Sequence, residues 1–158
     1  MIAYFDCFSG ISGDMTLGAL LSLGLPKEKL LEDLKKIDLE NYSVEIFPGS
    51  RSGIAATGLQ VRVGPQHHDH RSFGEIRSLI GESGLESKVK EISLKIFGRL
   101  AEAEARVHNT SVDEVHFHEV GAVDSIVDIV GTAAGIAYFN PEKILSSELP
   151  MGRGFVNC

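Results

Sequence analysis

Histidine and aspartate side chains, both of which bind metal ions, gather in two short stretches of this chain. The first stretch places His67, His68, Asp69 and His70 side by side in a polar loop. Neutral imidazole is a ligand for nickel, zinc, copper and iron, and a loop can wrap a metal without regular spacing. The loop therefore predicts metal binding. Two other interpretations remain open: an incidental polar loop, or a dynamic tract that collects metal without a fixed site.

The second stretch starts as an alternating pattern and continues as a helical one. Val115 and Phe117 alternate with His116 and His118, which is typical of a half-buried strand with both imidazoles on one face. Apolar residues at three- and four-residue spacing over 123–130 then predict a helix. We therefore expect two neighbouring imidazoles beside the start of a helix.

Two aspartates in that expected helix are candidates for binding a cation. Asp124 and Asp128 are four residues apart, so they share one helix face. Their apolar neighbours indicate a mostly buried helix, and a buried carboxylate needs a partner. A cation is one such partner. The alternative is that Asp124 caps the helix and Asp128 pairs with an arginine.

A glycine- and serine-rich turn near the start of the chain is a candidate anion site. It follows an apolar segment, residues 2–7, which we expect to be a central strand. Gly10 and Gly13 allow a ligand to approach the backbone closely. The N–H groups at the start of the following helix attract anions, and Ser9 and Ser12 add hydroxyl donors.

Four charged residues flank these segments. Asp6 stands at the end of the expected strand, where it could hold a metal or its bound water, and Asp14 suits a helix cap. Arg71 precedes a capping box at 72–75 and so lies near the positive end of a helix. Arg153 lies in a glycine-flanked loop, where it is placed to meet phosphate.

The periodicity predicts an α+β fold. Expected helices cover about 14–23, 26–37, 72–81, 86–108 and 123–139, and expected strands cover 2–7, 42–47, 54–63, 115–118 and a segment from 144. Strands 42–47 and 54–63 should form an antiparallel hairpin. The order of elements resembles a ferredoxin-like split βαβ sheet with additional helices.

Composition limits the classes of function. The 158 residues suffice for one domain, and 43% of them are apolar, which allows a packed core. The net charge of −7 argues against a general nucleic-acid binder. No apolar run reaches the roughly 18 residues that span a membrane, and the first residues lack the basic region of a signal peptide. Cys7 and Cys158 indicate no disulfide framework, so we expect a reduced, cytoplasmic protein.

Three motifs occur in one order along the chain. They are Asp6-x-Phe8-Ser9-Gly10-Ile11-Ser12-Gly13-Asp14-Met15, then His67-His68-x-His70-Arg71, then His116-Phe117-His118-Glu119-Val120-Gly121-Ala122-Val123-Asp124-Ser125-Ile126-Val127-Asp128. Together they resemble the N-terminal part of LarC, the family of nickel insertion proteins for the nickel-pincer cofactor of lactate racemase. The resemblance covers essentially all 158 residues. Family members usually continue into a further domain, so we expect 1–158 to be a single N-terminal domain truncated before a C-terminal domain.

The resemblance implies a nickel chelatase, a lyase-type enzyme of cofactor biosynthesis. It would insert nickel into pyridinium-3,5-bisthiocarboxylic acid mononucleotide with CTP as co-substrate, assisted by Mn²⁺ or Mg²⁺. The expected partners are this mononucleotide and CTP, with no nucleic acid and no membrane. A homo-oligomer and a separate C-terminal portion are also expected. The alternatives are a nickel chaperone or store without nucleotide chemistry, and a metal-free nucleotide-binding domain with surface histidines.

Under the enzyme hypothesis the candidate residues take three roles. The catalytic residues are Asp14 and Asp124, which also help to hold the assisting cation. The cofactor-binding residues are Ser9, Gly10, Ser12, Gly13, Arg71 and Arg153. The metal-binding residues are His67, His68, His70, His116, His118, Asp6 and Asp128. In this scheme the histidine loop collects nickel, and the 116–118 pair delivers it. Imidazole suits this task because protonation lowers its affinity and allows release.

Overall fold

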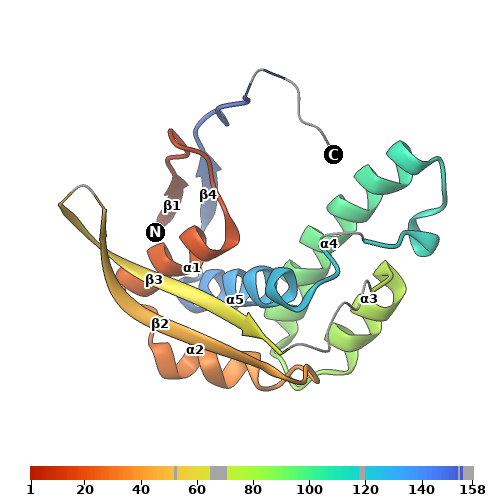
Figure 1. Ribbon diagram of the computed structural model, residues 1–158, viewed down its shortest axis with the longest axis horizontal. Helices are drawn as coiled ribbons and strands as arrows, with labels where there is room; N and C mark the ends of the chain where they lie inside the picture. Colours follow the sequence, from red (N-terminus) through yellow and green to blue (C-terminus); the bar gives the residue numbers. More distant parts are fainter. Residues whose placement is uncertain (52, 65–70, 118–119, 153, 155–158) are drawn as a thin grey trace.

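The computed structural model describes residues 1–51, 53–64, 71–117, 120–152 and 154 (Figure 1). In chain order the elements are β1 (Ile2–Phe5), α1 (Gly13–Ser22), α2 (Lys27–Leu34), β2 (Tyr42–Arg51), β3 (Ile54–Val63), α3 (Phe73–Glu82), α4 (Ser87–His108), a 3₁₀ turn (Val112–Glu114), α5 (Val123–Phe139) and β4 (Lys143–Ser146). None of the helices in these ranges is both long and apolar enough to cross a bilayer.

Helix α5 is the centre of the molecule and contacts α1, α2, α4 and β3 (Figure 1). Two of its glycines let α1 pack closely. A Cβ on Gly131 would lie 2.8 Å from a methyl carbon of Leu17, and one on Gly135 would lie 2.7 Å from a methyl carbon of Leu20. Glycine at these two positions in a helix is explained by this close packing. It offsets the roughly 1 kcal/mol that a helical glycine costs relative to alanine.

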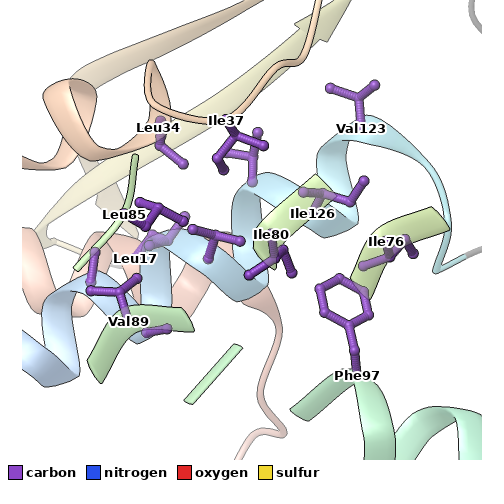
Figure 2. Packing of buried hydrophobic residues seen from close by; sticks show 14 of the residues in the cluster. Leu17, Leu34, Ile37, Ile76, Ile80, Leu85, Val89, Phe97, Val123 and Ile126 are labelled. Atoms are coloured by element: carbon purple, nitrogen blue, oxygen red, sulfur yellow. The ribbon is translucent and has the colours of Figure 1, made fainter. Parts of the chain in front are cut away.

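The hydrophobic core joins all five helices. Figure 2 shows Leu17 of α1, Leu34 of α2, Ile80 of α3 and Ile126 of α5 directed into one apolar cluster with Val89 of α4. An aromatic group extends this cluster towards the start of α5. The ring of Phe117 lies 6.4 Å from that of Phe73 and 6.2 Å from that of Phe97, measured between centroids. Such edge-on and tilted pairs add stability beyond the burial of area.

The α+β class is confirmed, but the described strands form two separate two-stranded sheets. β1 pairs with β4 in parallel, with Phe5 opposite Ser146, whereas β2 and β3 form the expected antiparallel hairpin. The described strands therefore do not form the single ferredoxin-like sheet. The hairpin packs on α1 instead of beside β1, and a methyl group on Gly18 would overlap the carbonyl oxygen of Thr57. β1 is an edge strand with Ile2 exposed, so the expectation of a central strand was wrong.

Local signals in the sequence place the helix ends correctly. Ser72 and Glu75 form the predicted capping box at the start of α3. Asn109 ends α4 and Asn140 ends α5, with backbone φ of 51° and 45°. Asparagine tolerates this left-handed conformation better than most residues, which explains why both helices stop there.

Candidate functional site

The glycine turn meets helix α5 at a very close contact. Gly13, the first residue of α1, lies against Asp128, and a Cβ at position 13 would overlap the Cβ, Cγ and Oδ2 atoms of that aspartate. Only glycine fits without movement of one of the two helices. The turn itself needs a second glycine, because Gly10 has φ of +86° and its N–H donates to the carbonyl of Cys7 at 2.9 Å.

Two extended segments pair beside the start of α5. The N–H of Phe73 donates to the carbonyl of Val115 at 3.0 Å, and that of Phe117 donates to the carbonyl of Arg71 at 3.3 Å. Gly121 packs on this pair, since a Cβ there would lie 2.8 Å from the backbone nitrogen of Arg71. The guanidinium of Arg71 donates to the carbonyl of Gly121 at 3.5 Å. The arginine is therefore held beside the helix start.

His116 lies next to this arginine, but not on a regular strand. Val115 and Phe117 are buried and His116 is exposed, which confirms the predicted alternation. Within the described part of this segment, residues 115–117, the structure has an isolated bridge between Ser72 and His116 in place of the predicted strand, and His118 lies outside the described residues. On the side that leads into α3 the bridge cannot extend, because the helix begins at Phe73.

Two of the three carboxylates at this place are exposed at helix starts. Oδ1 of Asp14 accepts from the N–H of Met15 at 2.8 Å and from the hydroxyl of Ser12. Oδ1 of Asp124 accepts from the N–H of Ser125 at 2.8 Å. Both side chains thus satisfy donors in a first turn, where a negative charge is stabilised by the helix dipole. For Asp124 this is the kind of contact that the capping alternative expects.

The third carboxylate, that of Asp128, is half-buried, and the hydrogen bonds among the described residues do not compensate the loss of water at its Oδ1. Its Oδ1 is buried and has no hydrogen-bond partner among the described residues, so the arginine partner of the alternative interpretation is not found there. Burial raises the pKa of Asp128 to about 6, with further contributions from the negative charges of Asp14 and Asp124. A cation at this position would reverse each of these effects.

The three aspartates do not form a complete metal site by themselves. They are close enough for Asp14 and Asp124 to act on Asp128, yet the described ranges contain no group of three or more metal-binding side chains that could hold one ion. The two observations agree, because charges influence one another over distances longer than a metal–ligand bond. Mg²⁺ is commonly bound by one or two carboxylates plus substrate phosphates, so the donors present fit a cation that arrives with a nucleotide.

The remaining candidates fall into two groups. Asp6 and Ser9 are exposed in the described turn, and Asp6 is not among the charges that raise the pKa of Asp128. The other group lies outside the described residues, and its members are His67, His68, His70, His118 and Arg153.

Sequence reasoning missed one carboxylate near the imidazole. Hydrogen bonds from the backbone and side chain of Ser72 lower the pKa of Glu75, and the positive charges of His116 and Arg71 lower it further. The capping box identified Glu75 as a helix-start residue. Its proximity to His116 had no local signal, because the bridge between residues 72 and 116 is a tertiary contact.

The fold and these two places on α5 define a class of protein: an α+β domain in which a glycine turn meets a carboxylate that lacks a hydrogen-bond partner among the described residues, while an arginine and an imidazole lie beside the start of the same helix. These groups suit an anion together with a metal ion. Residues 3–158 match the family model described as nickel insertion protein, and the chain belongs to this family.

Its relatives carry names that agree with the family. The chain is 52% identical over 155 residues to a protein of Geobacter sp. strain M21 and 54% identical over 154 residues to one of Syntrophobacter fumaroxidans, both provisionally named nickel insertion proteins. It is 47% identical over 169 residues to the pyridinium-3,5-bisthiocarboxylic acid mononucleotide nickel insertion protein of Clostridium kluyveri.

These alignments cover unequal shares of the two partners. They span 98% of this chain but 40% of the Geobacter protein and 39% of the Syntrophobacter protein, and 99% of this chain but 42% of the Clostridium protein. The chain thus spans about two fifths of the length of the curated relatives that it matches. No solved structure matches the chain.

Proposed function

We propose that this chain takes part in CTP-dependent insertion of nickel into pyridinium-3,5-bisthiocarboxylic acid mononucleotide, as a nickel chelatase of the lyase type. Membership of the nickel insertion family and the name of the Clostridium kluyveri relative support this proposal. The observation that carries it is the contact of the glycine turn with Asp128, which sets an anion-binding backbone against a carboxylate that lacks a partner among the described residues.

The glycine turn and Arg71 bind phosphate in this proposal. Gly13 presents backbone without a side chain at the positive end of α1, and Ser12 adds a hydroxyl. Ser9 and Gly10 complete the turn, and Arg153 belongs to the same proposal from its sequence position. The phosphate is that of CTP or of the mononucleotide, since both ligands carry the same group.

The aspartates hold the cation that accompanies the phosphate. Asp128, Asp14 and Asp124 supply the hard oxygen ligands that Mg²⁺ and Mn²⁺ prefer, and Asp6 supplies another at the end of β1. When bound, such an ion neutralises negative charge on the phosphates. Backbone N–H groups at the two helix starts hold the carboxylates of Asp14 and Asp124 in position.

Nickel is the substrate metal, and imidazoles carry it. His116 is exposed beside the bridge to Ser72, where it can bind nickel from solution and release it to sulfur ligands. The sequence adds His118 and the loop histidines His67, His68 and His70 to this proposal. A cytoplasmic location, a homo-oligomer and a separate C-terminal portion remain part of it as well.

Isothermal titration tests the proposal on this chain. We expect nickel and CTP with Mg²⁺ each to bind, and each to bind more tightly when the other is present. Binding of nickel alone would favour a nickel store, and binding of CTP alone would favour a metal-free nucleotide-binding domain. Asp128→Asn should weaken nucleotide binding in the presence of Mg²⁺, whereas Asp113→Asn, a surface change near α3, should leave it unchanged.

A further inference from the structure

A cleft of about 520 Å³ lies between β1, the glycine turn, α1 and the C-terminal end of α5. Figure 1 shows β1 and β4 standing beside α1 at the edge of the molecule. Met15 and Ala19 of α1 line the cleft, and so does Phe139 of α5. Its volume is within the range of about 300–1,000 Å³ that is typical of sites for small organic ligands.

The walls of the cleft suit a flat, largely apolar ring. Its side chains are mainly apolar, with Tyr4, Phe5 and Ile11 among them, and Asp6 is the only acidic residue in the lining. Tyr4 and Phe5 point to opposite faces of β1, so one of the two rings can face the cleft, and an aromatic ring together with a carboxylate attracts a cationic ring more than a neutral one. These features describe a site for a positively charged heteroaromatic ring such as pyridinium.

The cleft adjoins the glycine turn that carries the proposed phosphate site. Gly10 and Ile11 belong to the glycine turn and also line the cleft, and α1 forms a wall along its length from the turn. A ligand with a phosphate at one end and a ring at the other could therefore place the phosphate on the turn and the ring in the adjoining cleft.

We propose that this cleft binds the ring of a pyridinium mononucleotide whose phosphate lies on the glycine turn. The inference rests on the proposed function, and it adds the place where the ring is recognised and the residues that select it. Asp6 then serves to recognise the charged ring, in addition to any contact with a cation. The ring of CTP is neutral, so the cleft binds it more weakly than it binds a pyridinium ring.

The test uses two commercially accessible ligands that differ only in the ring. Nicotinic acid mononucleotide contains a pyridinium ring, ribose and phosphate, and ribose 5-phosphate lacks the ring. Titration should show saturable binding of the mononucleotide and at least about tenfold weaker binding of ribose 5-phosphate. Ala19→Phe fills the cleft from an exposed helix position and should weaken mononucleotide binding by about the same factor without affecting ribose 5-phosphate.

A matched control separates filling of the cleft from a general effect of phenylalanine. Ala103→Phe makes the same change at an exposed position of α4 that does not line the cleft, and it should leave binding unchanged. Circular dichroism confirms that both variants fold.

Three results would overturn the inference. One is equal binding of both ligands, and another is unchanged mononucleotide binding in Ala19→Phe. The third is dissociation of an oligomer by Ala19→Phe in sedimentation experiments, with no effect on the ligand, which would make the cleft a protein interface. Each can occur while the coupled binding of nickel and CTP persists, and loss of that coupling alone counts against the proposed function.

Discussion

Gly13 lies against the side chain of Asp128, so closely that a methyl group at position 13 would overlap the carboxylate. This contact joins the start of α1 to the second turn of α5. It explains why the aspartate is half-buried without a polar partner among the described residues. It also brings a backbone suited to anions next to a group suited to cations.

The first prediction concerns this contact. Gly13→Ala should destabilise the protein by about 1–3 kcal/mol, because one of two packed helices has to move. Gly81→Ala is the matched control, since a Cβ there meets nothing within 4 Å. That change should stabilise α3 by about 0.5–1 kcal/mol through helix propensity. Urea unfolding of both variants measures the difference, and equal stability of Gly13→Ala and wild type would contradict the packing.

The second prediction is a pH dependence that comes from Asp128. Its pKa in the folded protein is about 6, against 3.8 in the unfolded chain, so folding disfavours the charged form. The penalty is absent below pH 3.8, grows between pH 3.8 and 6, and is constant above. Asp128→Asn should therefore be more stable than wild type above pH 6, by about 1–2 kcal/mol after allowance for solvent screening.

Thermal unfolding of wild type and Asp128→Asn between pH 3 and pH 8 checks this sign. A neighbouring change provides the control. Asp14→Asn removes a negative charge that acts on Asp128, so it should lower the pKa of that carboxyl, which carbon NMR can follow. A pKa of Asp128 that does not move would show that the two carboxylates do not interact.

The third prediction concerns the capping box of Ser72 and Glu75 at the start of α3. Ser72 follows Arg71 in the chain and forms the bridge with His116. Ser72→Ala removes the acceptor of the Glu75 N–H and should cost about 1 kcal/mol. Ser78→Ala, at an exposed position within the same helix, should have little effect.

The same capping box predicts a pH dependence. The pKa of Glu75 is lowered in the folded state by its hydrogen bonds to Ser72, so the stabilisation from these bonds is present above the ordinary glutamate pKa of 4.5 and is lost as the pH falls. Glu75→Gln should abolish that acid-dependent loss in chemical unfolding.

The fourth prediction concerns nickel. Replacing His67, His68 and His70 together by alanine should weaken nickel binding at neutral pH by at least about tenfold, because imidazole is the favoured ligand type. His116→Ala should also weaken it, with a change in stability below about 0.5 kcal/mol, because this side chain is exposed. His108→Ala is the control, since this histidine pairs with Glu104 at 3.2 Å at the far end of α4. Unchanged affinity in the triple variant would remove the loop from the site.

Elements that depend on neighbouring residues were predictable from the sequence. The capping box, the ends of the helices at 108 and 139 and the antiparallel pairing of the hairpin all occur as the pattern predicted, although β2 continues past residue 47 to Arg51. The alternation of Val115, His116 and Phe117 also gave the correct inside and outside faces. These features follow from side-chain period and backbone conformation, which act over a few residues.

Contacts between distant segments were decided by the tertiary structure. Nothing near β1 indicates that β4 is its partner, and nothing near His116 indicates that Ser72 forms a bridge with it. The sequence by itself determined that glycines, carboxylates and imidazoles with metal- and phosphate-binding chemistry are present in this chain. The packing of α1 on α5 decided that Gly13 meets Asp128, because burial and charge at that carboxylate depend on which helix covers it.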